Sequence, residues 1–214
     1  MAGPDAMQTA VEAVVFDLGN VLIRWHPHAA IAREVGPEQA SAFLAAEDFD
    51  FLVWNSRQDA GRGWAEAEAL AVASHPHWER AIRAYRRHYE HSLLGPIEDT
   101  VTVLEELHGH GIPLFALTNW SAELFPHARE RFGFLDLFED IVVSGDEGVA
   151  KPDPRIFATL ARRAGRDLAA CVFIDDSPRN VAAAREAGMD AIHFTDTGHL
   201  RGDLRRRGLP LAPA

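Results

Sequence analysis

The chain has 214 residues, of which 47% are apolar and 25% are charged, and its formal net charge is -11 at pH 7. This composition is ordinary for a globular protein with one domain, or with a core domain and an insertion. The negative charge argues against nucleic acid as the main partner, because a surface that binds phosphate backbones is normally basic. A small anionic substrate remains compatible, since a pocket can be locally positive inside an acidic protein.

The sequence carries a single cysteine, Cys171, inside an apolar run. One cysteine cannot form an internal disulfide, which favours a reducing, cytoplasmic location. No apolar run reaches the ~18 residues that a membrane span needs, so we expect no membrane partner. The first ten residues, MAGPDAMQTA, lack the basic start and apolar centre of a signal peptide and predict a disordered leader. We expect a soluble monomer or homodimer.

The first predicted strand, residues 12–17 (EAVVFD), ends in Asp17 and is followed by a glycine-containing turn. A long stretch without any strand-like run follows this turn, and it contains three amphipathic helical patterns. These patterns are PEQASAFLAA (37–46), GWAEAEALAVAS (63–74) and HWERAIRAYRRHYEHSL (77–93). We interpret residues 26–93 as a helical domain inserted after the first strand, with residues 10–25 and 94–214 forming the core domain.

Downstream, short apolar runs alternate with helical patterns. The predicted strands are 112–118, 140–145, 170–176 and 190–194, and the predicted helices are 97–111, 121–133, 153–165, 177–188 and a final solvated helix around 201–209. Ser121, Asp153 and Ser177 are expected to cap three of these helices, and each of the three patterns ends in a glycine. Strands that are apolar on both faces suit a parallel sheet covered by helices. The alternation predicts an α/β fold with a doubly wound, Rossmann-like sheet.

In such a sheet, ligands bind beyond the carboxyl ends of the strands. The polar residues expected at that edge are Asp17, Thr118, Asn119, Lys151, Asp175 and Asp176. Helix capping or solvation accounts for each residue alone, but their coincidence at one edge predicts a site. Clustered carboxylate oxygens favour a hard cation such as Mg²⁺. A carboxylate can attack phosphorus to give an aspartyl-phosphate when a cation and a lysine offset the charge repulsion.

Four stretches resemble, in order and placement, the four motifs of the haloacid dehalogenase (HAD) superfamily. They are FDLGNVL (16–22), LTNWS (117–121), AKPDPRIF (150–157) and FIDDSPRN (173–180). The helical insertion is similar to the cap domain of the subgroup whose cap follows the first strand. Within that subgroup, the motifs are similar to those of sugar-phosphate phosphatases of the α-D-glucose-1-phosphate phosphatase type. The resemblance implies a hydrolase that acts on a small phosphorylated metabolite, with Mg²⁺ as cofactor.

The resemblance also implies a role for each matching residue. Asp17 would be the nucleophile, Thr118 and Asn119 would hold the phosphoryl group, and Lys151 would neutralise Asp17 and the transferring oxygens. The metal ligands would be Asp17, the Gly19 carbonyl, Asp176 and, directly or through water, Asp175.

Gly19 is a departure from the pattern, because most phosphatases of the superfamily have an acid/base aspartate two positions after the nucleophile. General acid–base help is typically worth about 10²–10⁴-fold in rate. Three explanations stay open. The substrate has a good leaving group; water or the nearby His26 substitutes; or the protein is a slow phosphatase that mainly binds phosphorylated ligands.

The main alternative enzyme is a metal-independent 2-haloacid dehalogenase. The adjacent acids Asp175 and Asp176 argue against it, because two neighbouring carboxylates repel each other without a cation. A catalytically weak protein that binds phosphorylated ligands is the second alternative.

Within the insertion, the stretch FLVWNSRQDAGRGW (51–64) is the candidate substrate-binding region. Trp54, Asn55, Arg57 and Asp59 could line a sugar pocket, and Trp54 and Asn55 are the residues we expect to bind substrate. Packing of Trp54 inside the insertion is an equally supported alternative, since pockets and cores both use aromatic side chains. Gly61 and Gly63 predict a tight loop that points at the core.

Overall fold

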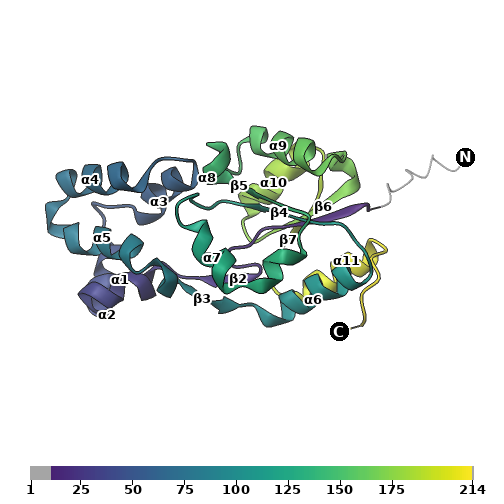
Figure 1. Ribbon diagram of the computed structural model, residues 1–214, viewed down its shortest axis with the longest axis horizontal. Helices are drawn as coiled ribbons and strands as arrows, with labels where there is room; N and C mark the ends of the chain where they lie inside the picture. The colour runs from purple at the N-terminus through teal and green to yellow at the C-terminus, as the bar shows by residue number, and fades with distance from the viewer. Residues whose placement is uncertain (1–10, 214) are drawn as a thin grey trace, which may run out of the picture.

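The computed structural model describes residues 11–213, so the predicted N-terminal leader lies outside the described residues. Five parallel strands form one sheet in the order β5-β4-β1-β6-β7 (Figure 1). The strands are β1 Ala13–Phe16, β4 Leu114–Thr118, β5 Asp140–Val143, β6 Cys171–Asp175 and β7 Asp190–His193. This confirms the predicted doubly wound α/β fold. Because β1 lies at the centre, the ends of β4, β1 and β6 are neighbours.

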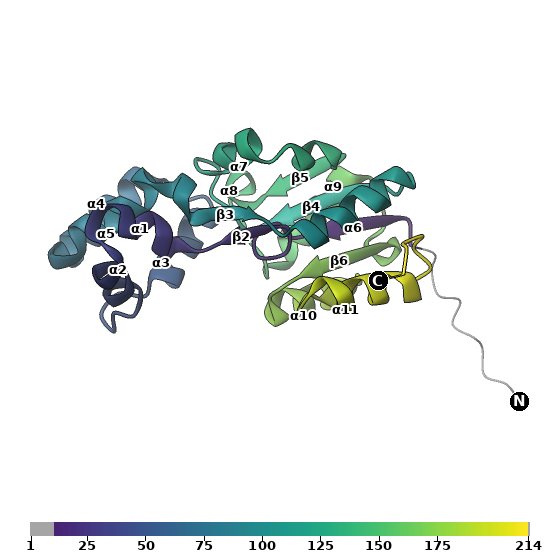
Figure 2. The same cartoon turned by 90° about the horizontal axis from the view of Figure 1, so that it is seen from below.

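Helices cover both faces of the sheet (Figure 2). They are α6 Glu98–Gly109, α7 Phe125–Arg131, α8 Ser144–Glu147, α9 Pro154–Ala164, α10 Pro178–Glu186 and α11 Thr197–Arg206, with short 3₁₀ turns η3 Gly133–Leu137 and η4 Leu168–Ala170. Val14 and Phe16 pack in one cluster with α6, α7 and α11, whereas Ala13 and Val15 pack with α9 and α10. The alternation of side chains along β1 therefore fills both layers of the core.

The predicted helix boundaries are accurate where the capping chemistry is local. In α9, the Asp153 carboxylate accepts a hydrogen bond from the Arg155 N–H at 2.9 Å, and Gly165 closes the helix with a φ of 62°. At the start of α10 the Ser177 hydroxyl does not cap the helix. Instead, Asp175 Oδ1 accepts the hydrogen bond from the Ser177 N–H at 2.8 Å. The N-terminus of α10 therefore holds an acid of the predicted site.

The predicted helix 121–133 is wrong at its beginning, because α7 starts only at Phe125. Ser121 does not cap it. Its hydroxyl accepts a hydrogen bond from the Trp64 indole N–H at 2.8 Å. The side chain is thus used for a contact with the helical segment 26–93, which local sequence rules cannot foresee.

The helical segment forms a separate group of helices beside the sheet (Figure 1). Its helices are α1 Pro27–Val35, α2 Pro37–Leu44, α3 Phe51–Asp59, α4 Trp64–Ser74 and α5 Glu79–Arg87, with 3₁₀ turns η1 Pro76–Trp78 and η2 Tyr89–Ser92. They pack around fully buried side chains that include Phe43, Trp64 and Tyr85. The sequence did not predict α1 or α3. In α3 two of the four buried positions are the amides Asn55 and Gln58, so the apolar stripe is incomplete.

The sequence also gave no sign of a two-stranded antiparallel ribbon where the chain leaves and re-enters the core. It consists of β2 Ile23–Trp25 and β3 Leu93–Pro96, with a register shift between Arg24 and Trp25. These strands are short, and β3 contains glycine and proline, which are depleted in strands. The ribbon is the covalent connection between the helical segment and the sheet.

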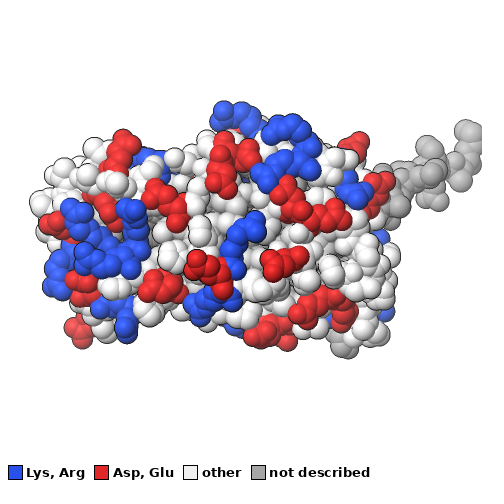
Figure 3. Space-filling model, in the orientation of Figure 1, with Lys and Arg blue, Asp and Glu red and all other residues white. Residues whose placement is uncertain are grey.

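The surface carries mixed charge. On the face shown in Figure 3, basic side chains gather over α5, which contributes Arg80, Arg83, Arg86 and Arg87. All four pair with glutamates, namely Glu34, Glu79, Glu68 and Glu123. Across residues 11–213, none of the helices is both long and apolar enough to cross a bilayer.

Gly145 marks a close backbone approach that the fold depends on. A Cβ added there would lie 2.3 Å from the Ala122 nitrogen and 2.7 Å from the Trp120 oxygen, so backbone would have to move. We expect Gly145→Ala to lower the free energy of unfolding by about 3 kcal/mol, which corresponds to a fall in Tm of roughly 6–12 °C at this chain length. Thermal and urea unfolding would measure it.

The matched control is Gly133→Ala, because an added Cβ at Gly133 meets no atom within 4 Å. Its stability should stay within about 0.5 kcal/mol of the parent. Equal stability of the two variants would contradict the tight approach at Gly145.

Candidate active site

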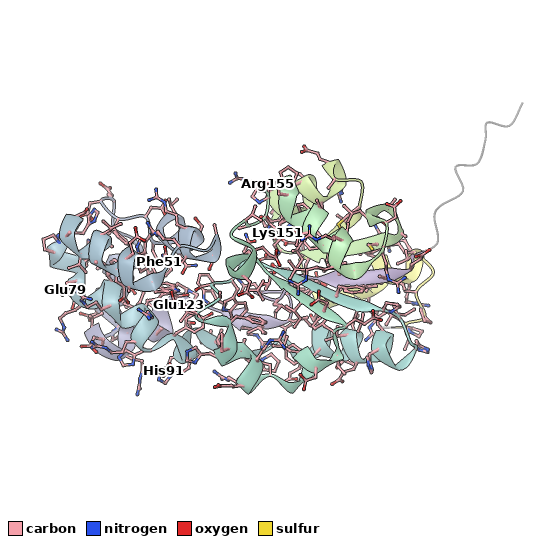
Figure 4. The ribbon with its side chains drawn as sticks, turned by 45° about the horizontal axis from the view of Figure 1, so that its top comes forward. Phe51, Glu79, His91, Glu123, Lys151 and Arg155 are labelled. Atoms are coloured by element: carbon pink, nitrogen blue, oxygen red, sulfur yellow. The ribbon has the colours of Figure 1, made fainter. Side chains whose placement is uncertain are left out.

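The ends of three neighbouring strands bring the predicted residues together. Asp17 follows β1, Thr118 ends β4, and Asp175 ends β6 with Asp176 next in the chain. Lys151 comes from the loop between α8 and α9 and lies on the core side of the molecule (Figure 4). The sheet order therefore assembles residues that are up to 159 positions apart in the sequence.

Lys151 is the centre of this cluster. Its ammonium lies 3.0 Å from Asp17 Oδ1 and donates hydrogen bonds to Asp175 Oδ2 and the Leu117 carbonyl, both at 2.7 Å. The lysine side chain is only 1% exposed. A buried ammonium needs such partners, because an unpaired charge in the interior is costly.

Asp17, Asp175 and Asp176 each offer an oxygen within 4.8 Å of the others. Both oxygens of Asp175 already accept hydrogen bonds: Oδ1 from the Ser177 N–H and Asn180 Nδ2, and Oδ2 from Lys151 and Asn180 Nδ2. Asp175 thus anchors Lys151, and this arrangement favours Asp176 over Asp175 as a direct metal ligand.

Burial dominates the electrostatics of the cluster. It raises the pKa of Asp17 to about 7, against the opposing effect of Lys151 and with further increases from Asp175 and Asp176. Burial and then Asp175 also raise the pKa of Asp176. Burial alone would lower the pKa of Lys151, but its pairing with Asp17 and Asp175 raises it. Three carboxylates around one ammonium leave an excess of negative charge, and their oxygen donors fit a hard divalent cation.

Gly19 lies beside this cluster with no steric need to be glycine. It makes an isolated bridge with Ile23, and a Cβ built on it would meet no atom within 4 Å. Its φ is also outside the left-handed region that favours glycine. Neither the space around Gly19 nor its backbone conformation therefore explains why an aspartate is missing at this position.

Thr118 and Asn119 were both expected to hold the phosphoryl group. Thr118 is 1% exposed at the end of β4. The Asn119 amide instead makes a reciprocal pair with the Lys151 backbone: Nδ2 donates to the carbonyl at 2.9 Å, and Oδ1 accepts from the N–H at 2.8 Å. In this geometry Asn119 orients the Lys151 loop.

A cavity opens next to the cluster, between the core and the helical segment. It is lined by Gly19, Trp25, Asn55, Asp59, Tyr85, Tyr89, Asn119, Trp120, Ser121 and Leu124. Asn55 lies in it as predicted, and its Oδ1 is buried without a hydrogen-bond partner among residues 11–213. These ten lining residues include aromatic, amide and hydroxyl groups but no lysine, arginine or histidine.

The helical segment is held against the core around this cavity. Glu123, which follows β4, accepts hydrogen bonds from the Trp64 N–H at 2.8 Å and from Arg86 at 3.1 Å. Figure 4 shows Glu123 between the helical segment, where Phe51 lies, and the core, where Lys151 lies. The cavity is therefore built by both parts of the chain.

Trp54, which was predicted to bind substrate, does not line this cavity. Trp54 is buried in the helical segment, where its ring packs against Phe49, Phe51 and Trp64 and its indole N–H donates to the Ala67 carbonyl at 3.3 Å. It does not line the cavity because its position on α3 faces the neighbouring helix α4.

His26, the suggested substitute base, also lies elsewhere. It lines a separate groove with Asn20, Trp25, Pro27, residues 44–47 and residues 49–52.

Several site residues escaped the sequence-based prediction. Tyr85 and Tyr89 are four positions apart in a predicted helix, a spacing that indicates only a shared buried face. Trp120 and Asn180 lie inside motif stretches, but their identity carried no signal of its own. Asn180 donates to both oxygens of Asp175 at 3.0 and 3.2 Å, a contact set by the first turn of α10.

Comparison with known proteins agrees with this architecture. Sesquiterpene phosphatase astK from Aspergillus oryzae is 28% identical over 89% of this chain and 93% of its own length. A phosphoglycolate phosphatase from Cereibacter sphaeroides is 30% identical over 86% of this chain and 84% of its own. A HAD family enzyme from Bacteroides thetaiotaomicron, solved with magnesium and inorganic phosphate, superposes with a TM-score of 0.69 at 22% identity, over 89% of this chain and 99% of that one.

The family model of the haloacid dehalogenase-like hydrolases matches residues 11–188. That range covers most of the chain and includes all four motif stretches and the residues around Lys151. The chain therefore belongs to the haloacid dehalogenase-like hydrolases.

Proposed function

We propose that this hydrolase is a Mg²⁺-dependent phosphatase that cleaves a small phosphomonoester through an aspartyl-phosphate on Asp17. The observation that carries the proposal is the buried Lys151 ammonium between Asp17 and Asp175, within a cluster of three carboxylates. The phosphatase names of its relatives, and the magnesium and phosphate bound by a structural neighbour, support the same activity.

The residues of the site divide the reaction between them. Lys151 pairs with one Asp17 oxygen and favours the ionised form of the carboxyl, so that the carboxylate can attack phosphorus. Asp17, Asp176 and the Gly19 carbonyl would hold Mg²⁺, with Asp175 fixing Lys151. Bound Mg²⁺ supplies positive charge that offsets the charge on the phosphoryl oxygens.

The helical segment, residues 26–93, would act as a cap over a core of residues 10–25 and 94–214. Its helices pack on one another, the β2–β3 ribbon joins them to the sheet, and Asn55, Asp59 and Tyr85 reach the cavity. A cap of this kind excludes water from the phosphoryl site, a common device in group transfer.

The walls of the cavity support an uncharged organic group on the substrate, such as a sugar. Trp25, Tyr85 and Trp120 offer aromatic surface, and Asn55 Oδ1 offers a free acceptor for a hydroxyl. A carboxylate on the substrate would find no lysine, arginine or histidine among the lining residues. The metal-independent 2-haloacid dehalogenase is disfavoured because, without a metal ion, only Lys151 would offset the negative charge of the three clustered carboxylates.

Asp17→Asn should abolish phosphate release, by at least about 10³-fold in kcat, because the amide cannot attack phosphorus. The control is Asp136→Asn, which changes an exposed carboxylate on η3. Phosphate release and thermal unfolding would be measured for both variants. Activity in a folded Asp17→Asn protein would remove the nucleophile assignment.

Mg²⁺ binding should weaken as the pH falls below about 7. The pKa of Asp17 is raised to about 7, so protons compete with the cation for this ligand below that pH and are largely gone above it. Titration calorimetry at pH 6 and pH 8 should give about tenfold tighter binding at pH 8, with proton release at the lower pH. A pH-independent affinity would contradict Asp17 as a ligand.

A neutral sugar phosphate should be a better substrate than 2-phosphoglycolate, by at least about tenfold in kcat/KM, because a mismatch of one buried charge costs 1.4 kcal/mol or more. A phosphate-release screen over sugar, glycerol and carboxylate-bearing phosphates would measure it. A preference for phosphoglycolate would overturn the assignment of an uncharged substrate group.

A further inference from the structure

We propose that Asp59, at the end of α3, transfers the proton to and from the leaving-group oxygen, in the role that Gly19 cannot fill. The inference rests on the proposed phosphatase function and assigns to it a catalytic residue from the helical segment. The motif pattern points to no such residue, because Asp59 lies forty positions after Gly19, in a different part of the fold.

The geometry places Asp59 at the cavity next to the carboxylate cluster. Asp59 and Gly19 line the same cavity, and Asp17 is close enough for its charge to act on Asp59. Asn55 Nδ2 donates to Asp59 Oδ2 at 2.9 Å, which orients the carboxyl.

The backbone at Asp59 is tied to the core. Its carbonyl accepts a hydrogen bond from the Ser144 hydroxyl at 2.5 Å, and Ser144 Oγ in turn accepts from the Trp120 N–H at 3.0 Å. Asp59 is therefore held relative to the sheet and not only to its own helix.

The loop after α3 reaches the core through contacts between glycines. A Cβ on Gly61 would lie 3.0 Å from Gly148 Cα and 3.4 Å from the Gly145 oxygen. Gly61 also has a φ of 97°, which other residues rarely adopt. As predicted from the sequence, the loop points at the core, and its approach brings the end of α3 to the cavity.

The surroundings of Asp59 keep a proton available. Burial raises its pKa to about 8, against a backbone hydrogen bond from Ser121, and the charge of Asp17 adds to the rise. The other titratable groups that interact with it are Tyr85 of α5 and Tyr89 of η2, whose own pKa values are raised, so both are neutral. An acid that titrates near neutral pH suits both donation and acceptance of a proton.

The two half-reactions balance with water as the co-reactant. First, an Asp17 oxygen bonds to phosphorus, the bond from phosphorus to the leaving oxygen breaks, and that oxygen takes its proton from Asp59. The Asp59 carboxylate then takes a proton from water as the water oxygen attacks phosphorus. The bond from phosphorus to Asp17 breaks, phosphate leaves, and Asp59 is again protonated.

The test is Asp59→Asn assayed with two substrates that differ in leaving group. An alkyl phosphate needs protonation of its leaving oxygen, whereas p-nitrophenyl phosphate does not. We expect kcat for the alkyl phosphate to fall by about 10²–10⁴-fold. With p-nitrophenyl phosphate we expect a rapid burst of one p-nitrophenolate per enzyme, followed by slow turnover, because only the second half-reaction loses its base.

Equal losses at both steps, with no burst, would overturn the assignment. Asp136→Asn, which changes an exposed carboxylate on η3 to an amide, is the matched control and should behave like the parent. If the parent enzyme itself released no phosphate from any phosphomonoester, the proposed function would fail instead.

A double variant tests the proton-transfer role of Asp59 by moving the carboxyl to position 19. Gly19→Asp combined with Asp59→Asn places a carboxyl where a Cβ meets no atom within 4 Å. With the alkyl phosphate, we expect kcat of this double variant to be at least about tenfold higher than kcat of Asp59→Asn alone. If the folded double variant were no faster than Asp59→Asn, the loss of a proton donor would not explain the low kcat of Asp59→Asn.

Discussion

The buried ammonium of Lys151 is the interaction on which the rest of the site depends. A charge with 1% exposure is tolerated only when every partner is in place, and here the partners come from β1, β4 and β6. The central position of β1 makes those strands neighbours. Asn119 clamps the Lys151 backbone, and Asn180 and the start of α10 hold Asp175. The strand order is thus a requirement of the charge balance as much as of the apolar core.

The two parts of the chain contribute different chemistry to the proposed site. The sheet edge supplies the carboxylates and the ammonium, which need a rigid frame because their spacing sets the charge balance. Both parts supply aromatic and amide groups to the cavity beside them, Asn55 and Tyr85 from the helical segment and Asn119 and Trp120 from the core. Trp64 connects the two parts, since its backbone N–H and its indole N–H both donate to the loop that follows β4.

The sequence predicts what is encoded locally and misses what depends on distant contacts. The strands, α9 with its Asp153 cap, and the convergence of the acids follow from periodicity, capping and the rule for strand ends. Helix α3 was missed because it buries amides, and Trp54 could not be assigned because packing and binding use the same side chain. The Ser121 hydroxyl and the Asn119 amide looked like a cap and a phosphate ligand. Their partners, Trp64 and Lys151, are 57 and 32 positions away.

Placing the proton donor on the helical segment solves an electrostatic problem of this cluster. An aspartate at position 19 would add a fourth carboxylate beside three whose mutual repulsion and burial already raise the pKa of Asp17. Asp59 lines the same cavity as Gly19 but comes from α3, where Asn55 donates to its carboxyl and burial raises its pKa to about 8. The site then contains its general acid without the charge of a fourth carboxylate. The hydrogen bond from Ser144 to the Asp59 carbonyl and the close approach of Gly61 to Gly148 hold Asp59 at the cavity, so the proposed proton transfer depends on contact between the helical segment and the core. Gly19 and Asp59 are thus complementary. Gly19 adds no further charge to the cluster of three carboxylates, and Asp59 supplies the proton from the helical segment.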